Sequence, residues 1–450
     1  MRRGALLTVV LLLVGSGCGG DGGLVTLTTG SETTATVPET TAATLPETTL
    51  PETTVPETTV PESTVPETST TVFTDAGRRW WRVPDDGAVL DGAGAQYMWS
   101  VASGGPGLVA VGFDESGGDR NAAVWTSVDG VTWERVQHRP RVFGRAGEQN
   151  MYSVTAGGPG LVAVGSDDSA GDADAAVWTS VDGITWNRVP HDDDVFGGPQ
   201  PQGMRSVVAG GPGLVAVGYD GSGPDWDAAV WTSVDGETWE RVPHLPRVFG
   251  GPRHQVMYSV AVAGPGLVAV GYDGSTSDVA VAAVWTSVDG ITWRRVLHDD
   301  EVFGGEAVQF MWSVTAGGPG VVAVGYDTSG PDWDAAVWTS VDGAIWERVP
   351  HDPAVLGGPR AQSMRAVVAA GPGLVALGTD GFGGDLDAAV WSSPDGITWE
   401  YLIDDQGALG GGSSQEMTAA TVWGDAIVGV GYDDSGEDRA AAVWISPPPE

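Results

Sequence analysis

One pattern of apolar and polar positions recurs along most of this chain, about every 53 residues. Within a copy, apolar runs alternate with turn sequences rich in Gly, Pro and Asp. In the second copy these runs are residues 153–156, 161–165, 175–180 and 185–189. Short apolar runs bounded by such turns are typical of strands rather than helices. The pattern predicts four antiparallel strands per copy, called A to D in chain order, which is typical of a β-propeller blade.

The number of copies predicts the number of blades. Each copy begins at a methionine, and these are Met98, Met151, Met204, Met257, Met311, Met364 and Met417. The last copy lacks strand D, and residues 78–86, which precede the first copy, match residues 184–192 of a strand D. We therefore predict an all-β, seven-bladed β-propeller of four-stranded antiparallel blades, closed by pairing of the N-terminal strand with the C-terminal blade. Closure removes the strand edges that an open sheet would expose.

The turn between strands C and D has a recurrent sequence, which in the second copy is Ser180-Val181-Asp182-Gly183-Ile184-Thr185-Trp186. It resembles the Asp-box of sialidase-type (BNR) repeats, and the Gly-Tyr-Asp after strand B of several copies resembles kelch repeats. The Asp-box resemblance implies propeller blades in which Ser and Asp bind the backbone of the turn and Trp packs inward. It also implies that the box is structural and lies outside any active site.

The N-terminal residues predict export. Residues 1–17 combine a basic start with an apolar run at residues 5–14, which is too short to span a bilayer. Together with Cys18 they resemble the signal peptide of bacterial lipoproteins, which implies cleavage before Cys18 and its acylation; an ordinary secretory signal is the alternative. Several acyl chains anchor a protein stably. We therefore expect the protein on the outer face of the membrane or the cell surface, held only by lipid at Cys18.

The chain divides into three parts. After the signal peptide at residues 1–17, residues 18–73 repeat Pro-Glu-Thr with little to bury, which predicts a disordered, extended tether. The propeller is expected at residues 74–450. The formal net charge is -38, and the basic residues are all Arg. This balance argues against nucleic acid as a partner, because a polyanion would be repelled. We expect a monomer.

Candidate ligand-binding residues lie where the copies differ. The B–C and D–A connections share one face of a propeller, and that face varies between copies. The residue after each repeat Met is expected to begin strand A at the mouth of the channel, and two B–C loops add a Trp each. Aromatic rings can stack on sugars and Arg can pair with an anion; the alternative is that these side chains only fill gaps between blades. The predicted ligand-binding residues are Trp99, Tyr152, Arg205, Trp226, Tyr258, Trp312, Trp333 and Arg365.

No catalytic constellation emerges from the sequence. The resemblance to sialidases would imply three Arg, a Tyr–Glu pair and an Asp, but only Arg205 and Arg365 occupy equivalent positions. We therefore predict a binding or interaction module that recognises a protein or glycan at the cell envelope, rather than an enzyme. A sialidase-like glycoside hydrolase is the first alternative, and a passive structural surface protein is the second.

Two further sets of polar residues are expected to be structural. A Gln two residues before each Met predicts a backbone hydrogen bond at each blade junction. His residues that end strand D in five copies diverge around the rim, so they cannot share a zinc ion. No metal site or cofactor is predicted. Calcium in the Asp-rich B–C loops stays open as an alternative, because carboxylates suit that ion although the usual loop spacing is absent. The Gln residues are Gln96, Gln149, Gln202, Gln255, Gln309, Gln362 and Gln415.

Overall fold

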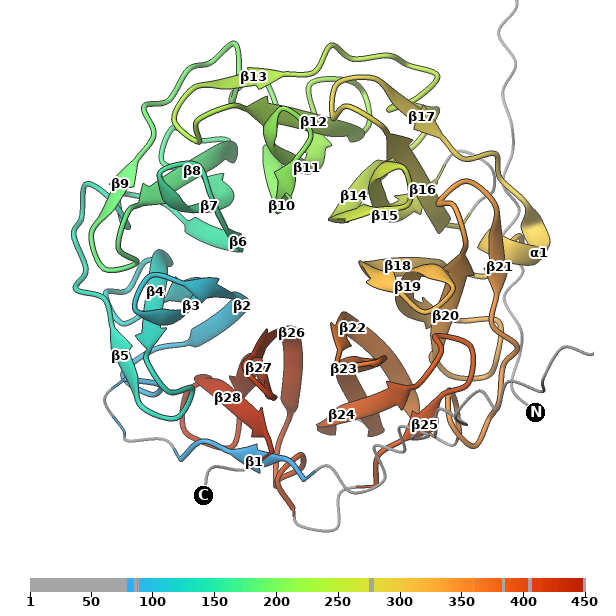
Figure 1. Cartoon of the computed structure of the whole chain (residues 1–450). Coiled ribbons are helices and arrows are strands. Elements are labelled where there is room, and N and C mark those ends of the chain that lie inside the picture. Colours follow the sequence, from blue (N-terminus) through green and yellow to red (C-terminus); the bar gives the residue numbers. More distant parts are fainter. Residues whose placement is uncertain are drawn as a thin grey trace, which may run out of the picture. The chain divides into compact units, whose positions relative to one another are not determined.

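The computed structural model describes residues 79–84, 87, 89–274, 279–358, 360–382, 385–403 and 407–447. The predicted signal peptide (1–17), Cys18 and the tether (18–73) lie outside the described residues. The described part forms seven four-stranded antiparallel sheets arranged around a common axis (Figure 1). No helix among the described residues is long and apolar enough to cross a membrane. The predicted seven-bladed propeller is confirmed.

The four strands of each blade follow each other outwards from the axis. The innermost strands A are β2 (Gln96–Gly104), β6 (Gln149–Gly157), β10 (Gln202–Gly210), β14 (Gln255–Ala263), β18 (Gln309–Gly317), β22 (Ala361–Ala370) and β26 (Gln415–Trp423). Strands B are β3 (Gly107–Asp114), β7 (Gly160–Asp167), β11 (Gly213–Asp220), β15 (Gly266–Asp273), β19 (Gly320–Asp327), β23 (Gly373–Phe382) and β27 (Ala426–Asp433).

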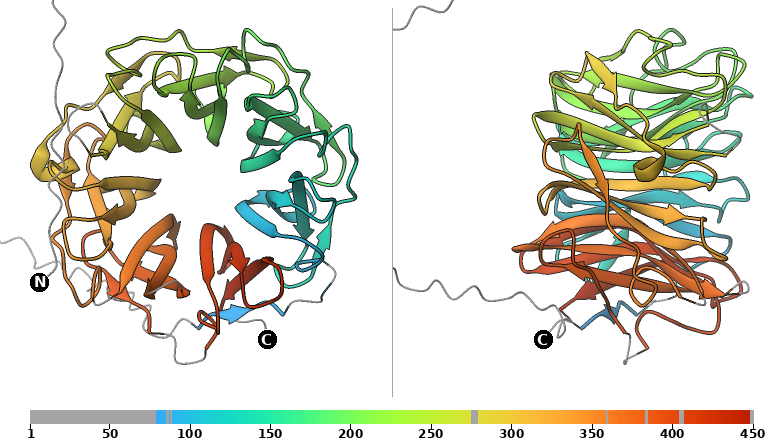
Figure 2. Two further views of the ribbon diagram at one scale, coloured as in Figure 1. Left: turned by 180° about the vertical axis from the view of Figure 1, so that it is seen from behind. Right: turned by 90° about the vertical axis from the view of Figure 1, so that its right-hand side faces the viewer.

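The outer half of each blade is shorter. Strands C are β4 (Asn121–Ser127), β8 (Asp174–Ser180), β12 (Asp227–Ser233), β16 (Val281–Ser287), β20 (Asp334–Ser340), β24 (Asp385–Ser393) and β28 (Ala440–Ser446). Strands D are β5 (Trp133–Arg135), β9 (Trp186–Arg188), β13 (Trp239–Arg241), β17 (Trp293–Arg295), β21 (Trp346–Arg348), β25 (Glu400–Tyr401) and β1 (Trp81–Arg82). One short helix, α1 (Asp300–Phe303), lies between β17 and β18. In side view the strands cross the thickness of the ring, so the connections gather on its two faces (Figure 2).

The N-terminal strand β1 closes the ring as predicted. It is the outermost strand of the sheet β1-β28-β27-β26, in which Trp81 pairs with Ile445 and Arg82 pairs with Trp444. The same register joins β8 and β9, where Arg188 pairs with Trp178. Arg82 also forms an ion pair with Asp433. The closing blade therefore repeats the architecture of the others, although its outermost strand comes from the N-terminal end of the propeller sequence and its other three strands come from the C-terminal end.

The hydrophobic core is divided into clusters between neighbouring blades. In one of them the fully buried Trp178 of β8 packs with Val111 of the preceding blade and with Phe143 of the D–A connection. The indole Nε1 of Trp178 donates to the carbonyl oxygen of Val142 in that connection at 2.7 Å. The strand C tryptophans thus hold each blade to its neighbour by burial and by one hydrogen bond, because a buried indole N–H needs an acceptor.

The C–D turn has the hydrogen bonds that the Asp-box resemblance implies. Ser180 Oγ accepts from the backbone N–H of Gly183 at 2.9 Å, and Asp182 Oδ1 accepts from the N–H groups of Ile184 and Thr185 at 2.9 and 2.6 Å. Trp186 is buried, and its Nε1 donates to the carbonyl of Gly183 at 2.8 Å. The box therefore fixes the conformation of the turn.

These turns predict a specific loss of stability in acid. Backbone N–H donors from Thr292 and Ile291 lower the pKa of Asp289 from 3.8 to about 2. The folded state thus binds fewer protons than the unfolded state, so the contribution of Asp289 is complete above about pH 4 and is lost as the pH falls through about 2. Denaturant unfolding between pH 5 and pH 2 measures this, and Asp289→Asn is expected to lose less stability over that range than the parent. Equal losses in both proteins would contradict the prediction.

The recurrent glutamines are structural, and Gln149 makes the predicted backbone hydrogen bond at the blade junction: its Oε1 accepts from the backbone N–H of Arg145 at 2.9 Å. Gln149 at the start of β6 is buried, and its Nε2 donates to Asp167 Oδ1 at 3.1 Å inside the same blade. Asp167 also forms an ion pair with Arg188 at 2.8 Å. Gln149 and Asp167 are cross-strand neighbours in the register of β6 and β7. A buried carboxylate needs such partners, so the glutamine serves the blade interior as well as the backbone of the blade junction.

Candidate functional site

A β-bulge in every strand A presents the residue after the repeat Met to the channel. In β10, Met204 pairs with Gly218 and Ser206 pairs with Val217, so Arg205 has no partner in the ladder. The same register shift occurs in the other six strands A. A bulge redirects the side chain that it releases from the regular alternation. The seven bulge residues are Trp99, Tyr152, Arg205, Tyr258, Trp312, Arg365 and Thr418.

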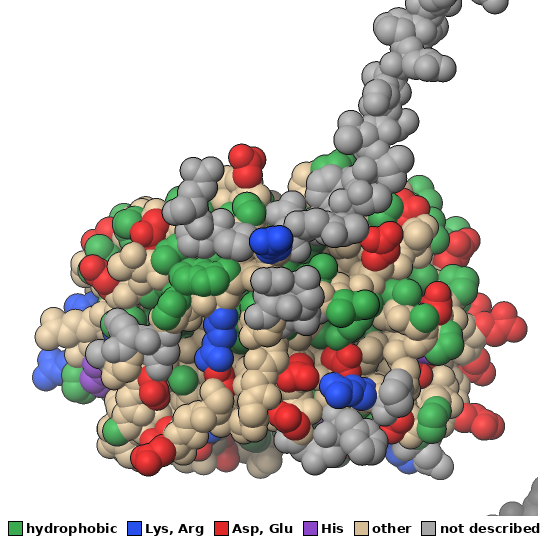
Figure 3. Space-filling model, turned by 90° about the horizontal axis from the view of Figure 1, so that it is seen from below, with side chains coloured by type: hydrophobic (Ala, Val, Ile, Leu, Met, Phe, Trp, Pro, Cys, Tyr) green, Lys and Arg blue, Asp and Glu red, His purple; other side chains and the backbone are tan. Residues whose placement is uncertain are grey.

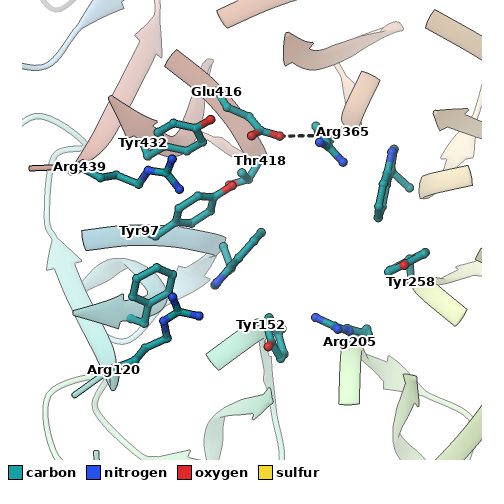
Figure 4. Close-up of a pocket in the computed structure, with 13 residues that line it drawn as sticks. Tyr97, Arg120, Tyr152, Arg205, Tyr258, Arg365, Glu416, Thr418, Tyr432 and Arg439 are labelled. Atoms are coloured by element: carbon teal, nitrogen blue, oxygen red, sulfur yellow. Dashed lines mark ion pairs between the residues drawn. The ribbon is translucent and has the colours of Figure 1, made fainter. Parts of the chain in front are cut away.

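The bulge residues surround one cavity of about 560 Å³ at the face of the B–C loops. Figure 4 shows its side chains converging from strands of several blades. Six of the eight predicted ligand-binding residues line it, and these are Trp99, Tyr152, Arg205, Tyr258, Trp312 and Arg365. All six are half-buried. The sequence comparison between copies thus finds residues that the fold brings together.

Trp226 and Trp333 do not line this cavity. Trp226 stacks on Tyr219 with ring centroids 4.6 Å apart, and Trp333 stacks on Tyr326 at 4.8 Å. Their exposed fractions are 37% and 50%, so both keep one face in solvent. They extend the aromatic surface outwards along the B–C loops of the third and fifth blades.

Arg205 carries the least compensated charge of the cavity. Its guanidinium carbon lies 4.3 Å from the ring centroid of Tyr152 and 5.4 Å from that of Tyr219. Its Nε is buried without a hydrogen-bond partner, and it forms no ion pair with any described residue. Aromatic faces stabilise a cation without neutralising it. The positive charge of Arg205 is therefore available to an anionic ligand (Figure 4).

Arg365 on the sixth blade is held differently. Its Nε lies 2.7 Å from Oε1 of Glu416, and its guanidinium stacks on Trp312 at 4.5 Å. Tyr258 contacts the same indole with ring centroids 4.4 Å apart. The ion pair joins the neighbouring sixth and seventh blades at the edge of the mouth and orients Arg365 against the rings of Trp312 and Tyr258.

Several lining residues were missed from the sequence. Tyr97 and Glu416 stand two residues before a bulge residue, so the alternation of a strand would have placed them on the channel side. Phe113 and Tyr432 are their cross-strand partners in strand B. Arg120 and Arg439 come from B–C loops, and their positions follow from loop conformation, which no repeat pattern sets.

The tyrosines beside Glu416 are kept protonated. Burial, followed by the charge of Glu416, raises the pKa of Tyr432 to about 12 and raises the pKa of Tyr97. At neutral pH both phenols are neutral hydrogen-bonding groups. Neither has the lowered pKa that an activated phenolate nucleophile requires.

Unsatisfied donors mark the same walls. The indole Nε1 atoms of Trp99 and Trp312 are buried, and neither has a hydrogen-bond partner among the described residues. A buried donor without an acceptor costs free energy, which a water or a ligand in the cavity would relieve by accepting the hydrogen bond. The cavity therefore offers aromatic faces and N–H donors but few acceptors.

The charge of the cavity is opposite to that of the whole chain. Its lining includes Arg120, Arg205, Arg365 and Arg439, with Glu416 as the carboxylate among the lining residues. The full chain has a formal net charge of -38, and the rim beside the ring closure shows many Asp and Glu side chains (Figure 3). A cationic aromatic site in an acidic protein selects for an anion, because the rest of the surface repels it.

Metal ligands are not gathered in the described residues. No group of three or more His, Cys, Asp or Glu side chains among them could hold a metal ion. Two of the His residues that follow strand D pair locally instead: His191 Nε2 lies 2.8 Å from Asp193 Oδ1, and His298 Nε2 lies 2.8 Å from Asp300 Oδ1.

Fold and site together define a seven-bladed β-propeller with a cationic aromatic channel mouth. No family model matches the sequence, and neither does any curated protein. The crystal structure of a protein of unknown function from Dyadobacter fermentans is similar. The two sequences share 16% identity over 82% of this chain and 99% of that chain, and the TM-score is 0.45.

Two further solved structures are similar at the same level. The periplasmic gluconolactonase PpgL of Pseudomonas aeruginosa shares 13% identity over 69% of this chain and 84% of its own, with a TM-score of 0.45. The protein YjhT shares 9% identity over 69% and 99% of the two chains, with a TM-score of 0.42. Similarity at this level carries no information on what the present chain binds.

Proposed function

We propose that this chain is an exported binding module, tethered to the outer face of the membrane or the cell surface through lipid at Cys18, that holds a glycan or protein partner at the channel mouth. The ligand group would combine a carboxylate with a ring, as an acidic sugar does. The observation that carries this proposal is the uncompensated Arg205 between aromatic faces in a cavity of about 560 Å³.

Different lining residues would contact different parts of the ligand. Arg205 would form charge-assisted hydrogen bonds to the carboxylate, which are about twice as strong as neutral ones. Trp99 and Tyr258 would stack on the ring, and neutral Tyr97 and Tyr432 would donate to or accept from its hydroxyl groups. The Arg365–Glu416 ion pair would fix the opposite wall.

Replacing Arg205 tests this assignment. Titration calorimetry with glucuronate and glucose compares a ring with and without a carboxylate, and glucuronate is expected to bind more tightly. Arg205→Gln is expected to weaken glucuronate binding by about 10- to 100-fold, because one charged hydrogen-bonding partner is lost. Arg294→Gln, a change of an exposed strand D arginine, is the control and should leave binding unchanged. Equal affinity for the two sugars, or no effect of Arg205→Gln, would exclude the proposal.

A sialidase-like hydrolase is the second candidate, and the lining residues argue against it. A sialidase would need a Tyr–Glu nucleophile pair and an Asp acid/base. Tyr97 and Tyr432 lie beside Glu416, but the pKa of both phenols is raised, Glu416 is paired with Arg365, and no Asp is among the lining residues. We therefore propose that the protein is not an enzyme, so a fluorogenic sialoside should show no turnover above background. Turnover that is lost in Glu416→Gln would establish the hydrolase instead.

A further inference from the structure

The connection between the first and second blades departs from the repeat. Four residues before its strand A glutamine, this connection carries Arg145, whereas the other six connections carry Gly92, Gly198, Gly251, Gly305, Gly358 and Gly411. Arg139 and Arg141 precede it in the same connection, where the next copy has Asp192 and Asp194. Because this position is Gly in six connections and Arg in the seventh, the blade architecture does not require an Arg there.

Two of these arginines, Arg141 and Arg145, border a second cavity, on the outer rim and away from the channel. Its volume is about 480 Å³. Arg141 and Arg145 form one side, and β9 with the residues that follow it, including Arg188 and His191, forms the other. Arg139 secures the connection against the second blade, because its Nη2 donates to the carbonyl oxygen of Trp186.

The charges around this second cavity do not balance. The charge of Arg188 is already paired inside the blade. Its guanidinium lies 2.8 Å from Asp167 and 4.6 Å from the ring of Trp178, and its side chain is 12% exposed. His191 lies 3.7 Å from Asp174 and 2.8 Å from Asp193. Arg141 and Arg145 are exposed and form no ion pair with any described residue. Two free guanidinium groups therefore face a hollow whose acidic residues already have partners.

The corresponding cluster in the fourth blade is a reference for what the repeat alone provides. There Asp273, Arg295 and His298 occupy the places of Asp167, Arg188 and His191. A cavity of about 10 Å³ beside them is bounded by Phe303 of the connection that follows the fourth blade, so it is not the counterpart of the rim cavity. The Asp–Arg–His arrangement is common to both blades, and the preceding connection differs in carrying Gly251 where the second blade has Arg145.

We propose that this rim cavity is a second binding site, for a carboxylate or phosphate group held by Arg141 and Arg145. The planar guanidinium matches two oxygen atoms of such an anion and forms short, charge-assisted hydrogen bonds to them. The acidic remainder of the surface disfavours anions elsewhere, so this site and the channel mouth would be separate anion sites on one molecule. The rim site does not depend on the channel mouth.

Two probes distinguish the sources of the anion: a tetraglutamate peptide and inorganic phosphate, each titrated calorimetrically at low ionic strength into the full chain. One or both are expected to bind, and Arg145→Gly and Arg141→Ala are each expected to weaken that binding at least tenfold. Arg145→Gly introduces the residue that the other connections carry at this position, so this variant is expected to fold like the parent protein. The controls are Arg247→Ala, at the equivalent of Arg141 two blades on, and Arg205→Gln in the channel.

The outcomes separate this site from others. Binding that survives Arg247→Ala and Arg205→Gln but falls in both rim variants supports the proposal, with either probe. Failure of both probes to bind overturns it. A loss that is equal in Arg247→Ala reflects general surface charge, and a loss confined to Arg205→Gln assigns the anion to the channel; either result overturns the rim site and leaves the channel proposal standing.

Discussion

Gly218→Ala is expected to lower the free energy of unfolding by at least about 3 kcal/mol, a large effect for one methyl group. A Cβ at Gly218 would lie 1.9 Å from the backbone carbonyl oxygen of Gly203. The oxygen belongs to the bulged strand β10, so it cannot turn away as a side chain could. Either the bulge or the pairing of β10 with β11 must yield, and Arg205 is displaced with them.

Gly223→Ala in the B–C loop of the same blade is the matched control. Its added Cβ would meet no atom closer than 3.5 Å. Denaturant unfolding should therefore place this variant within about 0.5 kcal/mol of the parent. If Gly218→Ala were as stable as Gly223→Ala, the close approach of the bulged strand would not be a requirement of the fold.

The same bulge explains which part of the fold could be predicted. The repeat, the turn sequences and the match of residues 78–86 to a strand D predict blades, their number and the closing register. Strand A is predicted at residues 153–156, whereas β6 spans Gln149–Gly157. The bulge interrupts the alternation of inward and outward side chains, and the first residue of the strand is a buried polar glutamine. The first residues of β6 therefore show neither the alternation nor the apolar run by which a strand is recognised in a sequence.

The part of the site that is formed by equivalent positions of the seven copies could be predicted from the sequence. Comparing copies finds the bulge residues, because seven equivalent positions must ring one axis. Alternation would have added Tyr97 and Glu416, and the antiparallel register would then have added Phe113 and Tyr432. The ion pair of Arg365 with Glu416 joins two blades, and the positions of Arg120 and Arg439 depend on loops. Those relations arise from tertiary structure, and no periodicity in one strand reveals them.

Trp80→Ala tests ring closure, the second large effect that the structure predicts. Trp80 precedes β1 and is buried in the cluster between the sixth and seventh blades, with Leu377, Leu409 and Ala442. Truncating a buried Trp to Ala costs about 3–5 kcal/mol, from lost burial and the cavity that remains. Here the cost falls on a two-residue strand that pairs only with β28. We therefore expect β1 to detach before the rest of the propeller unfolds.

Limited proteolysis separates detachment from general destabilisation. In Trp80→Ala, cleavage between residues 79 and 90 should precede any cleavage inside the other blades, and the uncovered edge of β28 should promote association, since exposed edges pair with other chains. Arg79→Ala, which changes an exposed neighbour, should show neither effect. Because Arg82 and Asp433 form an ion pair across the same sheet, detachment also leaves the buried Asp433 without its cation. Simultaneous cleavage throughout the propeller would show that β1 does not detach before the other strands, and that the ring does not open at its closure.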